Sequence, residues 1–379
     1  MVARIDRRPT TSGHPSRRRH PNAPSDEGRP PNATPCGATA TVDEPRGTPV
    51  TLRVRTSLPS VPPAPRVSVV VCADESTPFD GLTAALDSVL RDGDVHDVLV
   101  VVDRAPRLRD HLRHRYDDLL VVDNTRTPGL AGSRDTGIES ARGDVVAFLD
   151  ADCVAHAGWA RALAAPFDQV DVIAVVGRTE PTWPGRASSA LPDDLLWAVD
   201  CTPRTRPDGL VGLDDVAGAT VAFRRWDLLQ VGGLASGVDA REGVPRGAEF
   251  VELCLRLAAD EPEARVVSTS SARVSRTVRP SRTRQSSVVG AAVDRGVTQT
   301  ALRRSLGGEA DTAVLPGVTV ARLASGAWRS FVGRRRGTAV LAAAAVGLVA
   351  GRLLGLLRGT RVGLPIDQLE PLRSATVRH

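Results

Sequence analysis

From residue 67 onward, short apolar runs alternate with longer polar segments. Five of these runs are nearly continuous and rich in β-branched residues: Val67–Val71, Val98–Val102, Leu119–Val122, Val145–Leu149 and Val172–Val176. Such runs predict strands that are buried on both faces. Between the first two runs, apolar residues from Leu82 to Leu90 recur at the spacing of one helix face. The alternation predicts an α/β fold in which a mainly parallel sheet carries helices on both faces.

The other segments have different patterns. Residues 1–65 are rich in proline and arginine, which predicts a disordered tail with at most a short strand at residues 50–54. Residues 249–257 predict a helix, and residues 270–310 are basic and weakly helical. We therefore expect three parts. These are the tail 1–65, a central domain 66–305, and a basic helical extension 306–379 that contains the apolar segment 337–357.

Charge divides the 379 residues unevenly. The net charge is +5 and every basic side chain apart from histidine is arginine, but residues 67–269 carry −14 and residues 270–379 carry +13. The acidic segment 67–269 argues against nucleic acid as a partner and suits a site that holds a cation. The basic segment 270–379 suits an anionic membrane surface. Aromatic side chains, at 3%, are too few for a platform that stacks single-stranded bases. The five cysteines lack the paired spacing of a zinc site or a disulfide framework.

Acidic side chains follow two of the predicted strands. Asp103 ends the second apolar run, and Asp150 and Asp152 directly follow the fourth. Ligands of open parallel sheets bind outside the carboxyl ends of the strands, so these carboxylates are well placed for chemistry. Two carboxylates at positions i and i+2 can turn toward one hard divalent cation, Mn²⁺ or Mg²⁺, which keeps positions open for phosphate oxygens.

An ordered series of motifs surrounds these carboxylates. The chain reads TPGLAGSRDTG over 127–137, ARGD over 141–144, FLDAD over 148–152, GRTEPTW over 177–183, LWAVDCT over 196–202, GATVAFRR over 218–225 and GAEFVELCLR over 247–256. Each motif is weak alone, but the order is specific. It resembles the family-two glycosyltransferases of the GT-A fold, and one bacterial subgroup of them in particular. The resemblance covers about residues 66–305.

The resemblance implies a GT-A-like fold and the transfer, with inversion, of a sugar from a nucleotide diphosphate sugar to an acceptor hydroxyl. Asp150 and Asp152 would hold Mn²⁺ or Mg²⁺, which would neutralise the leaving nucleoside diphosphate. A glycan of the cell envelope, a lipid-linked sugar and a small molecule all stay open as the acceptor. At the positions that match the family's site, Asp103 would bind the base or ribose, Arg134 would face the diphosphate, and Asp150 would lie near the ribose. Gly218 and Ala219 would border the acceptor.

The half of the chain expected to bind the acceptor departs from the family pattern. Where the family has two consecutive acids, the second of which is the base, this chain has Glu249 followed by Phe250. Glu249 is therefore the candidate base. Glu252 is a weaker candidate, because residues three apart share a helix face but not a position. Asp135 also replaces the asparagine of the family's "ARN" motif.

A second departure concerns a histidine that often assists the metal or the diphosphate in the subgroup. It ends an "ARVhH" pattern, but residues 272–276 read ARVSR. Two hypotheses stay open: an active glycosyltransferase, or a catalytically impaired relative that binds a nucleotide sugar or a partner without turnover. A Rossmann dehydrogenase is disfavoured, because no G-x-G-x-x-G motif follows the first strand.

The apolar segment bears on location. Thr338–Leu357 has the length of a membrane span if Arg352 is included, and arginines flank it on both sides. A span, a helix packed in the protein and a helix at the membrane surface all fit this pattern. With the basic region beside it, we favour a cytoplasmic protein attached to the inner face of the cell membrane through anionic lipid.

Overall fold

The computed structural model describes residues 64–184, 191–212, 216, 219–234, 249–260, 263–306, 320–332 and 338–358. The predicted tail lies outside the described residues apart from residues 64 and 65, and the short strand expected at 50–54 lies outside them as well. Gly218, expected at the acceptor side, is also outside them.

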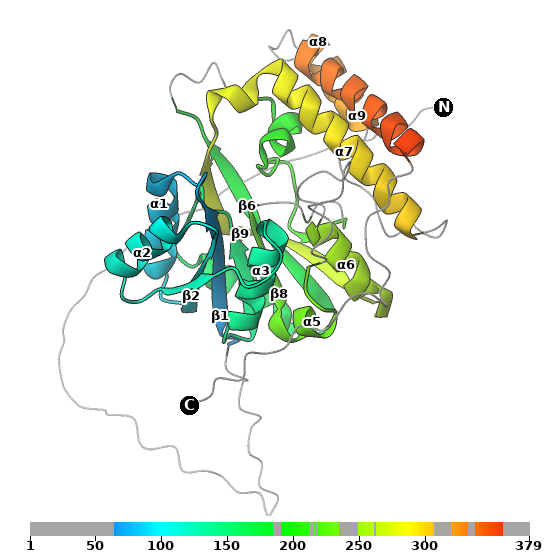
Figure 1. The fold of residues 1–379 in the computed structure, drawn as a ribbon. Helices are drawn as coiled ribbons and strands as arrows, with labels where there is room; N and C mark the ends of the chain where they lie inside the picture. The colour runs from blue at the N-terminus through cyan, green and yellow to red at the C-terminus, as the bar shows by residue number, and fades with distance from the viewer. Residues whose placement is uncertain are drawn as a thin grey trace, which may run out of the picture. The chain divides into compact units, whose positions relative to one another are not determined.

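The first half of the sheet alternates strands and helices (Figure 1). In chain order these elements are β1 (Val67–Asp74), α1 (Phe79–Leu90), β2 (Val95–Asp103), α2 (Pro106–Arg115), β3 (Leu120–Asp123), α3 (Leu130–Ser140) and β4 (Val145–Leu149). The strands lie in the order β3-β2-β1-β4, and all of their pairings are parallel. Each strand falls on a predicted apolar run, so the predicted alternation is confirmed in this half.

The second half of the sheet is mixed. Its elements are β5 (Cys153–Ala155), α4 (Trp159–Ala164), β6 (Val172–Thr182), β7 (Gly209–Leu210), β8 (Thr220–Arg224), α5 (Arg225–Gln230), α6 (Glu249–Asp260) and β9 (Arg265–Thr277). Strand β8 pairs antiparallel with both β4 and β6. The expectation of a mainly parallel sheet is therefore corrected. Among the described residues no α-helix lies between β6 and β8, and an antiparallel strand requires none.

Strand β9 was missed by the sequence pattern, which favoured a weakly helical segment from residue 270. Its inward positions alternate along the strand and are Val266, Ser268, Ala272, Val274 and Arg276. Two of these five side chains are polar, so the period-two signal of a half-buried strand is weak in the sequence. A 3₁₀ helix at Pro280–Thr283 follows β9, and α-helix begins only at Gln285, with α7 (Gln285–Leu306).

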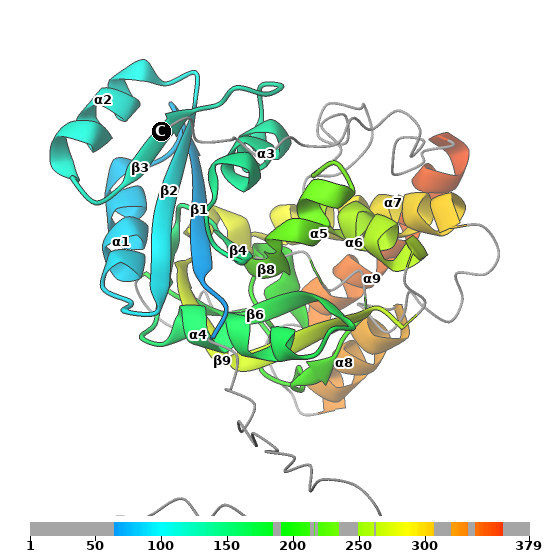
Figure 2. The same cartoon turned by 90° about the horizontal axis from the view of Figure 1, so that it is seen from below.

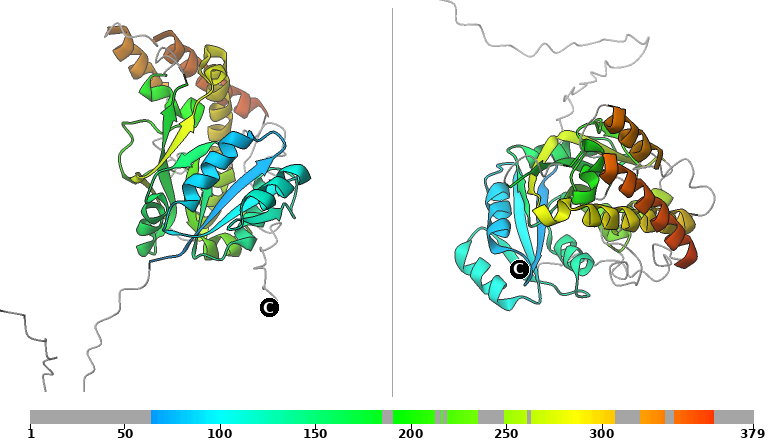
Figure 3. Two further views of the ribbon diagram at one scale, coloured as in Figure 1. Left: turned by 90° about the vertical axis from the view of Figure 1, so that its left-hand side faces the viewer. Right: turned by 90° about the horizontal axis from the view of Figure 1, so that it is seen from above.

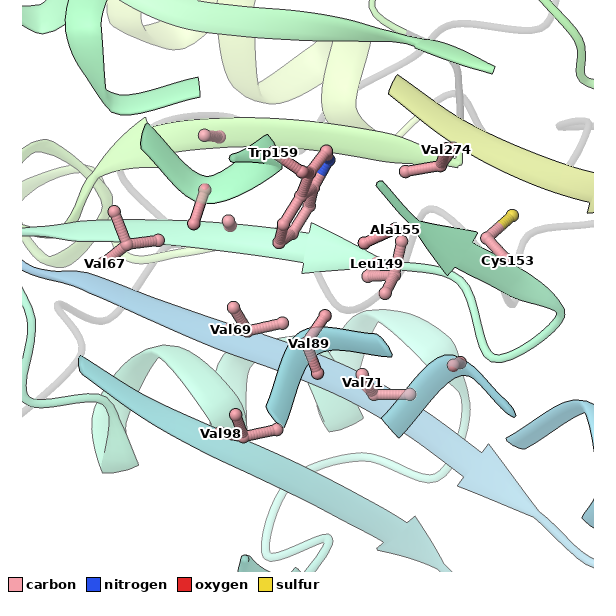
Figure 4. Packing of buried hydrophobic residues seen from close by; sticks show 14 of the residues in the cluster. Val67, Val69, Val71, Val89, Val98, Leu149, Cys153, Ala155, Trp159 and Val274 are labelled. Atoms are coloured by element: carbon pink, nitrogen blue, oxygen red, sulfur yellow. The ribbon is translucent and has the colours of Figure 1, made fainter. Parts of the chain in front are cut away.

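Helices cover both faces of the sheet, as predicted (Figure 2). Helices α1 and α4 contribute to the core on one face, and α3, α5 and α6 contribute to the core on the other. Figure 4 shows part of the first core, where Val69 and Val71 of β1 lie beside Val89 of α1. The indole of Trp159 is fully buried there, and its Nε1 donates a hydrogen bond of 2.8 Å to Oγ1 of Thr220. These cores hold the strand ends that form the site.

Three helices follow the sheet and gather on one side of it (Figure 3): α7, α8 (Val320–Val332) and α9 (Thr338–Arg358). They share a small core with a 3₁₀ helix (Asp193–Val199), built from Leu195, Val288, Leu323 and Leu341 among others. The predicted apolar segment is thus helix α9. Among the described residues it is the one helix long and apolar enough to cross a membrane, and 33% of its most apolar stretch is buried in the protein.

Candidate active site

A cavity of about 300 Å³ opens at the carboxyl ends of β1 and β4. The turn after β1 (Ser76–Pro78) borders it on one side, and Asp150–Asp152 border it on the other. The turn after β4 is fixed by its backbone, because the Asp150 N–H donates to the Ala219 carbonyl at 3.0 Å. Ala219 thus supports Asp150 through its main chain. The cavity thus lies at the strand ends where the sequence predicts the chemistry.

The two carboxylates of the predicted metal site are bound to an arginine. Nη2 of Arg276 lies 2.5 Å from Oδ2 of Asp150 and 2.8 Å from Oδ1 of Asp152, and Nε donates to the same Asp152 oxygen at 3.0 Å. Burial alone would lower the pKa of this guanidinium, but the charges of Asp150 and Asp152, among others, raise it well above its ordinary value. Arg276 is therefore a permanent cation between the two carboxylates.

These residues do not fit a divalent cation as they stand. No group of three or more His, Cys, Asp or Glu side chains within the described ranges is arranged to hold a metal. The position that a metal would take between Asp150 and Asp152 contains a guanidinium nitrogen. The subgroup's "ARVhH" pattern ends in a histidine that often assists the metal. In this chain the residue at that position is Arg276.

Arg134, expected to face the diphosphate, lines the cavity from α3. It pairs with Glu249, and its Nη2 lies 3.6 Å from Oδ1 of Asp150. Its guanidinium carbon lies 4.2 Å from the ring centroid of Phe250, within the range of a cation–π contact. Phe250 in turn stacks on Phe223 with ring centroids 5.6 Å apart. The phenylalanine at the family's base position therefore joins the core to the arginine of the cavity.

The two candidate bases lie on α6 but do not line the cavity. Glu249 is 1% exposed; one carboxylate oxygen binds Arg134, and Oε2 has no hydrogen-bond partner among the described residues. Glu252 binds Arg256 through two hydrogen bonds of 2.7 and 2.8 Å. The same Arg256 donates to the carbonyls of Val231 and Gly233, so Glu252 is part of a network that ties α6 to the turn after α5.

Asp103 organises the loop between β3 and α3. Its Oδ2 accepts the backbone N–H of Gly129 at 2.8 Å, and its Oδ1 accepts Nδ2 of Asn124 at 3.2 Å. Gly129 has φ of 120°, a conformation that favours glycine, and Ser133 of α3 donates back to its carbonyl. Asp103 is not among the side chains that line the cavity. Its contacts in this structure position the helix that carries Arg134.

Asp135 and Arg276 are residues of the site region to which the sequence argument assigned no role. Asp135 accepts the backbone N–H of Leu234 at 2.7 Å, and burial raises its pKa to about 8. The signal for both residues was present as a departure from the family motifs, at the asparagine of "ARN" and the histidine of "ARVhH". The sequence pattern could not indicate that Arg276 binds Asp152, because the two residues are 124 positions apart and meet only in the folded sheet.

One family model matches part of the chain. Residues 68–227 match the model for Glycosyl transferase family 2. The sequence-based resemblance is confirmed over this range, as is the predicted α/β fold class.

Individual relatives are distant. The chain is 33% identical over 75 residues to glycosyltransferase AglE of Haloferax volcanii, a stretch that is 20% of this chain and 25% of that protein. The chain thus matches only a quarter of the length of that relative. The solved mannosyltransferase PcManGT of Pyrobaculum calidifontis, in complex with GDP-Man and Mn²⁺, is 16% identical with a TM-score of 0.49 over 78% of this chain and 88% of that one. Glucosyl-3-phosphoglycerate synthase of Mycobacterium tuberculosis, with Mg²⁺ and UDP, is 17% identical with a TM-score of 0.36 over 61% of this chain and 79% of that one.

Proposed function

We propose that this protein transfers a sugar from a nucleotide diphosphate sugar to an acceptor hydroxyl. The observation that carries the proposal is the cavity at the ends of β1 and β4, two strands in the stretch that matches the family 2 model. Its lining holds three arginines and two aspartates, namely Arg134, Arg276, Arg279, Asp150 and Asp152. The guanidinium group of arginine matches phosphate oxygens in geometry and charge, so this lining suits the diphosphate of a donor.

The reaction requires one bond to form and one to break. The acceptor oxygen bonds to the anomeric carbon while the bond from that carbon to the diphosphate oxygen breaks. The bonding pair leaves with the nucleoside diphosphate, and the hydroxyl proton passes to a base. Inversion at the anomeric carbon follows if the acceptor attacks from the face opposite the diphosphate.

Glu249 is our proposal for that base, with Glu252 as the weaker alternative. Glu249 has one carboxylate oxygen bound to Arg134 and the other without a partner among the described residues. Glu252 is fully engaged by Arg256, so it has less capacity to take a proton. Ala219 and Gly218 are proposed to border the acceptor, and Asp103 to contact the nucleoside.

The assay for this proposal is the release of nucleoside diphosphate by the full-length chain from a panel of UDP-, GDP- and ADP-sugars. We expect one donor to be consumed, and faster when an acceptor is supplied. Glu249→Gln removes the base but keeps a hydrogen-bond acceptor for Arg134, so turnover should fall by about 10²–10⁴-fold with nucleotide affinity unchanged. Asp171→Asn, which alters an ion pair with Arg265 away from the cavity, is the control.

One second candidate is supported by a specific observation. Phe250 replaces the usual base and is buried between Phe148 and Phe223, where it serves packing. This favours a relative that binds the nucleotide sugar without turnover. Tight nucleotide binding with no consumption of any donor would establish that alternative. Full activity of Glu249→Gln would instead remove Glu249 as the base.

We also propose that the protein works at the cytoplasmic face of an anionic membrane. The outward face of α9 is apolar: Val346 is 70% exposed and Leu353 is 56% exposed. Residues 270–379 carry a net charge of +13, which complements anionic lipid. A lipid-linked or cell-envelope acceptor would be presented at such a surface.

A further inference from the structure

Arg276 is held more firmly than a surface arginine. In β9 it stands opposite Cys153 of β5 on one side and Pro181 of β6 on the other, so its backbone is fixed between two strands. Its side chain is 6% exposed, and it borders both the cavity at β4 and a smaller neighbouring cavity of about 190 Å³. Strand pairing fixes the backbone of Arg276, and burial leaves its side chain little contact with solvent.

The guanidinium and a metal ion compete for one position. Nη2 of Arg276 is within 2.8 Å of a carboxylate oxygen of both Asp150 and Asp152. A Mg²⁺ ion held by the same two oxygens would lie about 2.0–2.1 Å from each of them. The nitrogen and the metal would therefore overlap, and the charge of the guanidinium would repel a second cation.

Arg276 also has hydrogen-bonding capacity left after it binds the two aspartates. Its Nη1 lies 3.3 Å from Oδ2 of Asp200 but has no hydrogen-bond partner among the residues that the structure describes. That oxygen of Asp200 is already paired with Arg282 at 2.9 Å. A buried N–H donor without a partner is unfavourable, and a phosphate oxygen would satisfy it with a charge-assisted bond.

We infer that Arg276 takes the place of the divalent cation, so that this protein binds the diphosphate of its donor without a metal. The inference rests on the proposed donor site. As the bond between sugar and diphosphate breaks, the electron pair passes to the diphosphate oxygen, and Arg276 donates hydrogen bonds to the charge that develops there. Asp150 and Asp152 then act as positioning residues that aim the guanidinium, rather than as metal ligands.

The test is calorimetric binding of UDP and GDP to the full-length chain, in EDTA and in MnCl₂. We expect the preferred nucleotide to bind with the same affinity in both. Arg276→Ala should lose affinity on the order of 10- to 100-fold in EDTA, the range that charge-assisted hydrogen bonds span. Arg276→His should bind the nucleotide weakly in EDTA and regain affinity in MnCl₂. Arg265→Ala, at the other end of β9 and paired with Asp171, should behave like the unchanged protein.

A second measurement needs no variant. Electron paramagnetic resonance of Mn²⁺ alone should show no bound ion on the unchanged chain and a bound ion on Arg276→His. Nucleotide binding that requires Mn²⁺ and is unaffected by Arg276→Ala would overturn the role of Arg276 while leaving the donor site in place. Stoichiometric binding of Mn²⁺ to the unchanged chain would also overturn the role of Arg276 while leaving the donor site in place. Binding of no nucleotide in either condition would overturn the donor site and the inference together.

Discussion

At the scale of single residues, buried charges define this protein. Arg134, Glu249, Glu252, Arg256 and Arg276 are each less than 9% exposed, and each is part of an ion pair. Removing one member of such a pair leaves an uncompensated charge, which typically destabilises by about 3–5 kcal/mol. Each substitution at these positions, Arg276→Ala and Arg276→His included, therefore needs a parallel measurement of unfolding, so that effects on binding can be separated from effects on folding.

Asp135 gives a prediction about pH. Burial raises its pKa from 3.8 to about 8, so between these pH values the folded chain binds a proton that the unfolded chain does not. Its contribution to the free energy of unfolding is therefore largest at low pH and falls as pH rises toward 8. Asp135→Asn keeps an oxygen for the Leu234 N–H and removes the charge. It should raise the free energy of unfolding at pH 8.5 by roughly 1–3 kcal/mol, and the gain should shrink as pH falls toward 4.

Urea unfolding across this pH range measures the effect, and Asp144→Asn is the matched control. Asp144 is half-exposed, and its hydrogen bond with Arg66 lowers its pKa, so its loss should be slightly destabilising at neutral pH. An Asp135→Asn variant that unfolds with the same pH dependence as the unchanged chain would show that Asp135 is ionised in the folded state.

Residue types and spacing could predict part of the site. Asp150 and Asp152 stand directly after a strong apolar run, so their place at a strand end follows from local pattern, and the cavity lies beside them. Arg134 is carried to the same cavity by a helix whose motif was recognisable. Arg276 was beyond prediction, because a buried arginine in a strand has the same sequence signal as an exposed one, and its partners are set by strand pairing.

At the scale of elements, apolar runs predicted well where strands are continuous and buried on both faces, as in β1, β2 and β4. The pattern failed where tertiary contacts decide the structure. Strand β9 alternates serine, arginine and small apolar residues, so its identity as a strand comes from β6 beside it rather than from its own composition. Propensity is a weak guide in such segments.

The packing of α9 against α7 gives a prediction at this scale. A Cβ atom on Gly351 would lie 2.0 Å from the Val293 carbonyl oxygen, and one on Gly296 would lie 2.4 Å from the Leu348 carbonyl oxygen. Gly351→Ala should therefore push the helices apart and lower the free energy of unfolding by roughly 1–3 kcal/mol.

Thermal or urea unfolding of the full-length chain checks this, with Gly290→Ala as the control. A Cβ atom on Gly290, in α7, would meet nothing within 4 Å, so that substitution should stabilise by up to about 1 kcal/mol through helix propensity. Equal stability of the two variants would mean that α7 and α9 do not pack as closely as the structure has them.

At the scale of the whole molecule, charge and hydropathy are segregated. The acidic residues 67–269 contain both strands that open onto the cavity, and the basic residues 270–379 contain the three helices with the exposed apolar face. Arg276 and Arg279, at the start of the basic segment, also line the cavity, but α9 does not. The proposed attachment through α9 can therefore be altered without changing the cavity.

Membrane binding can be tested with the double variant Val346→Asp and Leu353→Asp. Both side chains are exposed on α9, so the fold should be unaffected, but charge on the apolar face opposes burial in lipid. We expect sedimentation with phosphatidylcholine vesicles that contain phosphatidylglycerol to fall by about 10-fold or more, because each buried apolar side chain contributes about 1.5–3 kcal/mol. Val170→Asp, at an exposed valine before β6, is the control. Equal sedimentation of the unchanged chain, the double variant and the control variant would exclude α9 as the anchor.

Arg276 also has an evolutionary consequence. The genetic code separates arginine from histidine by a single transition, as between the codons CGC and CAC. The residue that ends the "ARVhH" pattern is therefore one base change away from the arginine found here. If the guanidinium replaces the ion, a lineage could pass between metal dependence and independence in one mutational step. An organism short of manganese would then gain by the exchange, since a cation encoded in the chain is present in every molecule from the moment it folds.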